Sequence, residues 1–231
     1  MKITIFIICS VLFINNGLSA QDNKSIKVKA GTRILDYFPV AERYRYPNFS
    51  EGKVIFKNGK IIPGTLNYNF LSGEMQFIQL ADTLSLSNTK DLKLIVIAQD
   101  TFYCHNGYLE IIHCGKLNVY LKQAIVIKDI QKEGAYGTIN RSAASESYGY
   151  VLTSGNTVQL IVREDMILKK TAEYFYSTSE NDFIRFSKKN IINILPGKED
   201  LIKNYLKSNK IDFESREDLL RVTFFVSNLF P

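Results

Sequence analysis

The sequence predicts a mainly β protein, an antiparallel sandwich or partly open barrel, with a C-terminal α-helical segment, and so an α+β fold overall. From Ser25 to about Val162 the chain consists of short apolar runs separated by turn residues, which is typical of antiparallel strands. After Arg163 the hydrophobic period changes, and residues 187–231 carry amphipathic helical patterns. The composition, 45% hydrophobic and 23% charged, is that of an ordinary globular chain.

The first twenty residues predict a secretory signal peptide. Met1 and Lys2 form a basic start, residues 3–14 are almost entirely apolar, and small residues precede a cleavage site after Ala20. A retained membrane anchor is the alternative, but this run of about a dozen residues is shorter than the roughly twenty that span a bilayer. We therefore expect a protein exported to the periplasm, the outer membrane or the medium, with no transmembrane segment after signal cleavage.

The mature chain is expected to contain a β-rich domain, residues 21–186, and a helical segment packed on it, residues 187–231. The clearest hairpin joins residues 52–56 to 61–69 through Asn58-Gly59, which supplies the positive backbone angles of a two-residue turn. Pro63-Gly64 is expected to bulge or end the second strand before it continues at Thr65. Further strands are expected at 75–79, 84–86, 92–98, 101–103, 108–112, 117–121, 151–152 and 158–162.

A long loop is expected at residues 134–149, which are rich in Gly, Ser and Ala and follow neither the strand nor the helix period. Long loops on β scaffolds often carry function. Tyr136, Tyr148 and Tyr150 would make this loop a contact surface.

The chain after Arg163 leaves one alternative open. Residues 167–176 and 182–186 form either a last hairpin or, over residues 165–175, a helix. Beyond them, Ser187 is expected to cap a helix over residues 188–195, and Pro196-Gly197 ends it. Two longer helices are expected at residues 199–207 and 216–229. The second begins with Ser215 and Asp218, which resemble a capping box with Asp where Glu or Gln is usual.

The charge pattern gives no indication of nucleic acid binding. The net charge is +6 at pH 7, and the excess of Lys and Arg is spread along the chain. The densest basic spot, Arg43-Tyr-Arg-Tyr46, alternates cations with aromatics as single-strand binders do. We interpret it instead as a strand with tyrosines on one face and arginines on the other. The expected partner is an envelope or extracellular component of unknown identity.

Two residue pairs, Cys104-His105 and His113-Cys114, concentrate the soft reactive side chains. They suggest free structural thiols, a disulfide between Cys104 and Cys114, or a metal site. A tight turn at Asn106-Gly107 places Cys104 opposite Leu109 and leaves Cys114 roughly 16 Å further along, beyond the limit for a disulfide. Strand alternation also sends each histidine to the face opposite its neighbouring cysteine. We favour free thiols, then the disulfide, and expect no metal or other cofactor.

Catalytic motifs are missing from the sequence. It contains no Gly-x-Ser-x-Gly nucleophile elbow and no phosphate-binding Gly-rich loop followed by Lys and Ser or Thr. Paired carboxylates of a glycosidase could still come together in space from Asp36, Glu42, Glu51, Glu74 and Glu110. We therefore favour a non-catalytic envelope or secreted binding or structural protein, with a carboxylate-based hydrolase of an extracellular polymer as the alternative.

Two stretches of the chain resemble a group of exported proteins. The first stretch combines Gly64-Thr-Leu-Asn-Tyr-Asn69 with Gly73-Glu-Met-Gln-Phe-Ile78. The second is the ending of the chain, which runs from Lys188 through Ile202–Phe213 to Leu219. Both resemble uncharacterised exported proteins of Bacteroidota, and the resemblance covers about half of the mature chain. It implies export. The group has no established activity, so the resemblance implies no catalytic or binding residue.

Overall fold

The computed structural model describes residues 25–87, 89–133, 139–143, 161–179 and 182–230. Side chains at 131–133 and 139–143 are not described. The predicted signal peptide and the predicted strand at 151–152 lie outside these residues, as does most of the predicted strand at 158–162.

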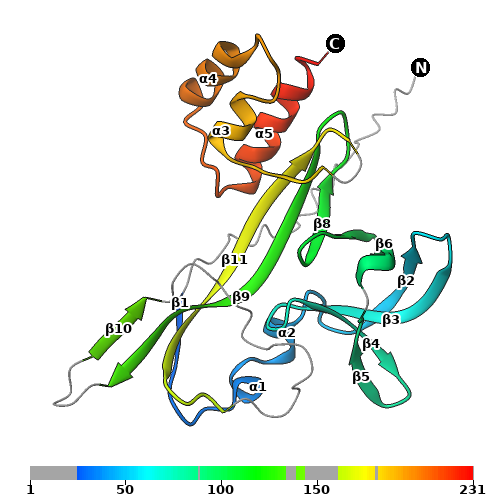
Figure 1. Ribbon diagram of the computed structural model, residues 1–231, viewed down its shortest axis with the longest axis vertical. Helices are drawn as coiled ribbons and strands as arrows, with labels where there is room; N and C mark the ends of the chain where they lie inside the picture. Colours follow the sequence, from blue (N-terminus) through cyan, green and yellow to red (C-terminus); the bar gives the residue numbers. More distant parts are fainter. Residues whose placement is uncertain (1–24, 88, 134–138, 144–160, 180–181, 231) are drawn as a thin grey trace, which may run out of the picture.

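A single antiparallel sheet forms most of the described chain (Figure 1). Its strands follow the order β1-β11-β9-β8-β7-β6-β2-β3-β4-β5, with β10 added to β9 and β12 added to β11. The strands are β1 Ser25–Val28, β2 Ser50–Phe56, β3 Ile61–Asn69, β4 Glu74–Gln79, β5 Asp82–Ser85, β6 Leu92–Ile97, β7 Asp100–Cys104, β8 Tyr108–His113, β9 Asn118–Glu133, β10 Ile139–Ala143, β11 Asp165–Ser177 and β12 Ile184–Arg185. The helices are α1 Ile34–Tyr37, α2 Val40–Arg43, η1 Thr89–Asp91 (a 3-10 turn), α3 Lys188–Ile192, α4 Glu199–Ser208 and α5 Arg216–Ser227.

The predicted fold class is confirmed: the protein is mainly β, and its C-terminal segment is helical. The sheet is open, and it curls until its far strands contact β9. The backbone N–H of Ile125 on β9 donates to the carbonyl of Phe70, which follows β3, at 2.8 Å. The hydroxyl of Tyr68 donates to the Gln123 carbonyl at 2.9 Å. Of the two predicted architectures, the partly open barrel is the closer.

The β2–β3 hairpin forms where the sequence predicts it, but its turn differs. Gly59 alone adopts a positive φ, 85°, and its N–H donates to the Phe56 carbonyl at 3.0 Å. The Asn58 side chain instead accepts from the Lys60 N–H at 3.0 Å. The predicted two-residue turn is wrong, because one left-handed residue closes this four-residue loop.

Pro63 neither bulges nor ends β3, contrary to expectation. It pairs with Lys53 of β2 in regular register, and β3 continues without interruption to Asn69. On the other side, β4 pairs only with residues 66–69 of β3. The missing N–H of Pro63 therefore faces no strand, which is where a sheet tolerates proline.

Strands β9 and β11 form a long ribbon that connects the two ends of the molecule (Figure 1). The far edge of β9 is shared by three partners in turn: β8 at 119–121, the Phe70 carbonyl at Ile125, and β10 at 129–133. The last of these corrects the sequence analysis, because the predicted loop at 134–149 contains strand β10. Residues 165–175 form β11, so the hairpin alternative is right and the helix alternative is wrong.

Two hydrophobic cores lie along this ribbon. The barrel-side core contains residues of β1, α1, β2–β4 and β6–β8. These residues pack on the middle of β9, around Ile125, and on the start of β11. The helix-side core contains residues of α3, α4 and α5. These residues pack on the start of β9 and the end of β11. Leu121 on β9 and Tyr174 on β11 belong to the helix-side core, whereas Ile125 and Leu168 belong to the barrel-side core. The helices thus share their core with strands of the β-rich region.

The three C-terminal helices begin where the sequence predicts. Ser187 caps α3 by accepting from the Asn190 N–H at 3.2 Å, and Ser215 caps α5 by accepting from the Asp218 N–H at 3.3 Å. The capping box is incomplete, because the Asp218 carboxylate accepts from the N–H of Asp212 at 2.8 Å instead of bonding back to the cap residue. Among the described residues, no helix combines the length and the hydrophobicity needed to cross a membrane.

Candidate functional site

A polar band crosses the ribbon between the two cores. On β8, Glu110 stands between Tyr108, which packs in the barrel-side core, and Ile112, which packs against the helix-side core. On β9, Gln123 stands in the same way between Ile125 and Leu121. Since alternate residues of a strand share a face, these polar side chains interrupt the apolar face where the two cores meet.

The centre of this band is a partly buried ion-pair network around Arg45. The Arg45 guanidinium donates to both oxygens of Glu110, from Nε at 2.9 Å and from Nη2 at 3.0 Å. The same Nη2 donates to Asp100 at 3.3 Å, and the Tyr46 hydroxyl donates to that Asp100 oxygen at 2.6 Å. The Glu110 side chain is only 8% exposed, against about a third for its two charged partners.

The residues around Arg45 hold it in this position. Its backbone N–H donates to the Tyr68 carbonyl at 2.9 Å, and its guanidinium lies 5.1 Å from the centre of the Tyr46 ring. Hydrogen bonding to Glu110 raises the pKa of Arg45, and burial raises the pKa of Tyr46 further above its usual range. The guanidinium therefore stays charged and the phenol stays neutral at every physiological pH.

Segment 43–46 differs from the strand expected there. Arg43 ends α2, and the residues after it form one isolated bridge, between Tyr44 and Asn69, and no regular strand. The Tyr44 hydroxyl donates to Gln76 on β4, whereas Tyr46 and Arg45 both reach Asp100 on β7. The predicted separation of tyrosines from arginines is therefore wrong, because Arg45 and Tyr46 converge on one carboxylate.

A second cation lies at the same junction. Lys170 on β11 stands between Leu168 of the barrel-side core and Ala172, which packs against the helix-side core. Its ammonium lies 4.1 Å from the centre of the Phe70 ring, a cation–π contact. Loss of water around the ammonium lowers the pKa of Lys170, and the charge of Arg45 acts in the same direction.

Further polar contacts connect β3, β4 and β5. Gln76 accepts from the Tyr44 hydroxyl at 2.8 Å and from the Asn69 amide at 3.2 Å, and its own amide donates to Ser85 at 3.3 Å. The Ser85 hydroxyl donates to Glu74 at 2.6 Å. These bonds fix the side chains between the three strands and tie β5 to the body of the sheet.

Cys104 and Cys114 are both free thiols in the structure. Cys104 is partly buried on β7 and packs against the barrel-side core, whereas Cys114 is exposed after β8. Cys104 lies opposite Tyr108, not Leu109 as expected, because residues 105–107 form a three-residue loop. Burial raises the pKa of the Cys104 thiol to about 11. Such a thiol is a poor nucleophile at neutral pH.

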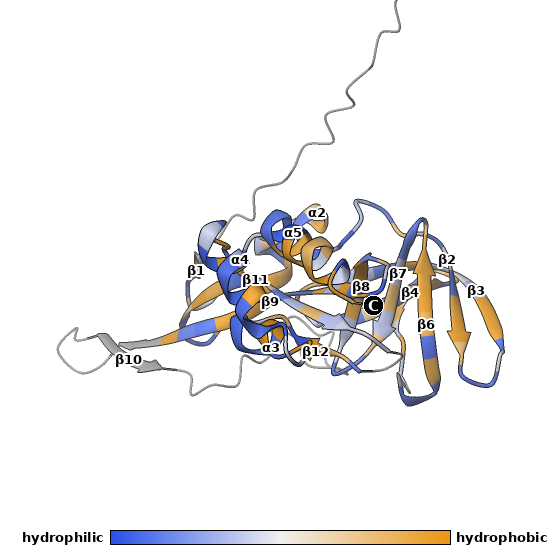
Figure 2. Ribbon diagram, turned by 90° about the horizontal axis from the view of Figure 1, so that it is seen from above, coloured by the Kyte–Doolittle hydropathy of each residue, from blue (hydrophilic) through white to orange (hydrophobic). Residues whose placement is uncertain are grey.

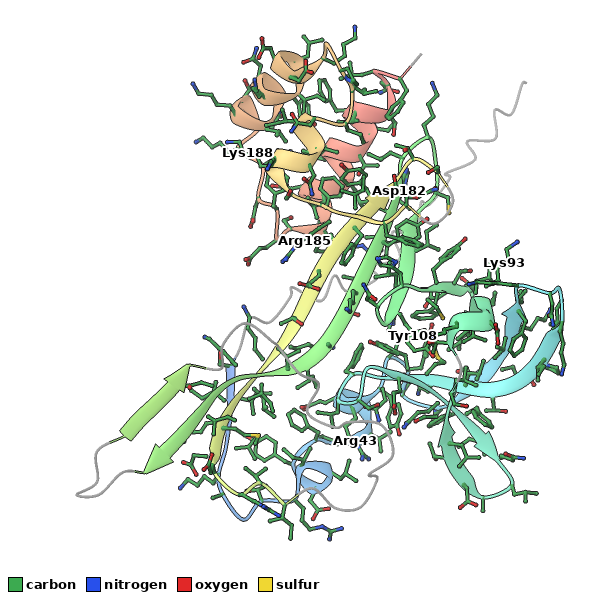
Figure 3. The ribbon with its side chains drawn as sticks, viewed as in Figure 1. Arg43, Lys93, Tyr108, Asp182, Arg185 and Lys188 are labelled. Carbon is green, nitrogen blue, oxygen red and sulfur yellow. The ribbon has the colours of Figure 1, made fainter. Side chains whose placement is uncertain are left out.

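Tyr108 and His105 lie beside Cys104, since Tyr108 pairs with it across the β7–β8 hairpin and His105 follows it in the chain. The Tyr108 hydroxyl is buried inside the curl of the sheet and makes no hydrogen bond within the described part of the chain (Figure 3). The His105 ring packs on Phe183 with the ring centres 4.9 Å apart. Nowhere in the described ranges do three His, Cys, Asp or Glu side chains gather as a metal site requires.

The five candidate carboxylates share no common partner among the described residues. Asp36 pairs with the exposed Arg33 at 3.4 Å, Glu74 binds Ser85, and both Glu110 oxygens are taken by Arg45. Glu42 and Glu51 are exposed. The hydrolase alternative gains no support from these contacts. Tyr136, Tyr148 and Tyr150, the predicted contact residues, lie outside the described residues.

Several exposed apolar side chains lie on the outer strands β3, β4 and β5. Five of the ten large apolar residues exposed on the described surface belong to β3, β4, β5 or the turn between the last two: Ile61, Ile62, Ile78, Leu80 and Leu84. Leu80 is 98% exposed and has a φ of 58°, a left-handed conformation that normally favours glycine or asparagine. These side chains are spread over both faces of the sheet, since Ile78 and Leu84 belong to neighbouring, oppositely facing pairs of β4 and β5.

The edge strand β5 leaves backbone groups free beside Leu84. In the described part of the chain, β5 pairs with β4 alone. The Leu86 N–H donates to the Met75 carbonyl of β4 at 2.8 Å. Because alternate residues of an antiparallel strand bond the same neighbour, Leu84 also faces β4, whereas the backbone groups of Thr83 and Ser85 point away from the sheet. This edge can receive another strand.

No protein-family model, curated protein or solved structure matches the chain. The resemblance to exported proteins of Bacteroidota stays a prediction, and the geometry above defines the protein as a mainly β chain with an open, partly apolar sheet edge.

Proposed function

We propose that the protein is an exported, non-catalytic binding or structural protein of the envelope or extracellular space, and that it holds an extended segment of a partner protein along β5. The observation that carries this proposal is the free edge of β5, with the outward backbone groups of Thr83 and Ser85. An added strand would gain main-chain hydrogen bonds from these groups.

The side chains beside this edge fit an apolar partner segment. Leu84 and Ile78 are exposed on the two outermost strands, and Leu80 projects from the turn between them. No Lys, Arg or Pro stands in β5, although such residues commonly protect edge strands from pairing. A strand with alternating apolar side chains would therefore contact Leu84 on one face of the sheet and, on the other face, Thr83, with Ile78 one strand further in.

The hydrogen bonds of Glu110 and Asp100 favour a structural role over catalysis. A general acid or nucleophile needs an oxygen that can reach the substrate. Both Glu110 oxygens accept hydrogen bonds from Arg45, and one Asp100 oxygen accepts from Arg45 and Tyr46. This network is suited to holding segment 43–46 against β7 and β8.

Site-specific photo-crosslinking in the producing cells tests the strand addition. Benzoylphenylalanine at Leu80 should give one saturable adduct with a partner polypeptide, and the same group at the exposed Leu201 on α4 should not. The adduct should disappear in the Thr83→Pro variant, because proline removes an outward N–H without removing a bond to β4. The matched Thr83→Ala variant should retain it.

Two results would overturn the proposal. One is the absence of any saturable adduct at Leu80, and the other is an adduct that survives Thr83→Pro unchanged. Mass spectrometry of the chain purified from the same cells tests export separately, since cleavage after Ala20 leaves Gln21 as the first residue.

A further inference from the structure

The outer end of hairpin β2–β3 carries exposed isoleucines on a lysine-rich turn. Ile61 is 56% exposed and Ile62 is 40% exposed at the start of β3, although both are large aliphatic side chains. They point to opposite faces of the hairpin, since Ile61 pairs with Ile55 and Ile62 with Val54. Figure 1 shows that this hairpin projects from the rest of the sheet, so neither isoleucine finds a core to cover it.

Backbone and side-chain bonds join this hairpin end to the turn η1. The Lys57 ammonium donates to the Lys90 carbonyl at 2.7 Å, and the Lys57 N–H donates to the Asp91 carbonyl at 2.9 Å. Within the hairpin, the Phe56 N–H donates to the Lys60 carbonyl at 2.9 Å. The end of the hairpin and η1 therefore form one ordered surface, which we call the basic tip: Lys57, Lys60, Ile61, Ile62, Lys90 and Lys93.

The basic tip has a strong excess of positive charge. Lys57, Lys60, Lys90 and Lys93 are all exposed, and Asp91 is the acidic residue among them. Figure 3 shows Lys93 at this end of the sheet. In the hydropathy colouring of Figure 2, β2, β3 and β6 are mainly hydrophobic strands, so the lysines form a charged rim on an apolar hairpin.

We propose that the basic tip binds the surface of an anionic phospholipid bilayer, with the two isoleucines entering the interface and the lysines contacting the lipid phosphates. A bilayer offers negative charge at the height of the lysines and an apolar layer just below it. A nucleic acid would instead be met by exposed aromatic rings for stacking, and the exposed side chains of the tip are aliphatic or cationic.

The absence of tryptophan from the chain gives a direct test. Ile61→Trp places a single indole at the tip, and its fluorescence reports entry into the bilayer. Emission should shift to the blue with vesicles of phosphatidylcholine and phosphatidylglycerol in equal parts, and it should not shift with pure phosphatidylcholine. Phe224→Trp, at an exposed position on α5, is the matched control and should not shift with either vesicle.

Lysine variants test whether the lysines of the basic tip contact the lipid phosphates. Lys60→Gln with Lys93→Gln should lower the partition coefficient on the anionic vesicles by about 25-fold, since each lysine near such a surface contributes about fivefold. Added salt should lower it in the same way. Lys188→Gln with Lys207→Gln, two exposed lysines of the helical segment, should leave it within about twofold.

The proposal is overturned if Ile61→Trp shows no shift on anionic vesicles, or the same shift on both vesicles, or if the two pairs of lysine variants behave alike. Circular dichroism checks that each variant folds. Thr83→Pro should bind the vesicles as the unmodified chain does, so the membrane proposal and the strand-addition proposal can fail separately.

Discussion

The two cores of this protein are built on the same ribbon but closed in different ways. The helix-side core is covered by three helices that follow one another in the sequence, and its buried members are almost all aliphatic or aromatic. The barrel-side core is closed by strands far apart in the sequence, and at its boundary it depends on the Arg45–Glu110 pair. The contrast lies in the charges: the Arg45–Glu110 pair with its buried carboxylate lies at the edge of the barrel-side core, whereas the Arg185–Glu173 pair of the other half is exposed.

The largest expected effect comes from that charge pair. Arg45→Met removes the only cation bound to Glu110 in the described structure and leaves a buried carboxylate without compensation. We expect the free energy of unfolding to fall by about 3–5 kcal/mol in urea titrations. Arg185→Met, which breaks an exposed pair with Glu173 in the other half of the molecule, should cost at most about 1 kcal/mol.

A double variant separates charge from packing at the same place. Arg45→Met with Glu110→Leu removes both charges and should recover most of the lost stability, because no buried charge is left unpaired. If Arg45→Met alone costs no more than Arg185→Met, the ion pair does not hold the barrel-side core.

The next largest effect is expected in the helix-side core. Leu219 of α5 is fully buried there, and Leu219→Ala leaves a cavity. We expect a loss of about 3 kcal/mol, measured by the same titration. A loss below that of an exposed Leu201→Ala control would show that α5 does not pack on the ribbon as described.

The two thiols differ in burial, and their reactivity tests this difference. Cys104 packs against the barrel-side core with a pKa of about 11, raised from 9.0 by burial. At pH 8 it should react with a thiol reagent about 100-fold more slowly than an unperturbed thiol, because only the thiolate reacts. The exposed Cys114 should react at an ordinary rate, and equal rates would contradict the burial of Cys104.

The raised pKa of Cys104 also makes the free energy of unfolding depend on pH, and the fold loses stability as the pH rises. The pKa of Cys104 is higher in the folded chain than in the unfolded chain, so its contribution is complete below pH 9 and is lost as the pH rises toward 11. Cys104→Ala should remove this part of the alkaline loss.

The smallest effect is expected at a helix cap. Ser215→Ala removes the side chain that accepts from the Asp218 N–H at the start of α5 and should cost about 1 kcal/mol. Ser208→Ala, at the exposed end of α4, is the control and should be nearly neutral. Equal effects would mean that the cap does not stabilise the helix-side core.

The sequence predicts the helices and strands that are determined by residues close together in the chain. The β2–β3 hairpin follows from its Asn58-Gly59 turn, and α5 follows from its cap and apolar stripe. Strand β9 was expected to end at Leu121 but continues to Glu133, because it gains partners from β11 and β10 that no local signal shows. The short helices α1 and α2 were missed for a similar reason, since each has only one turn of pattern.

The polar band could be predicted only in part. Glu110 was named as a candidate carboxylate and Arg45 belongs to the conspicuous 43–46 segment, but the two are 65 residues apart in the chain. One signal was available: an acidic residue at an inward position of the apolar run 108–112 requires a buried cation. Which cation fills that need depends on the curl of the sheet, and the sequence does not specify it locally.

Hydrogen exchange along β9 tests the central claim, that one ribbon carries two cores separated by the polar band. In Leu219→Ala, we expect the amides of residues 119–121 to lose protection while those of residues 125–127 keep it, because the second group lies beyond Gln123 in the barrel-side core. Equal loss of protection along the whole strand would contradict the claim and show a single cooperative core.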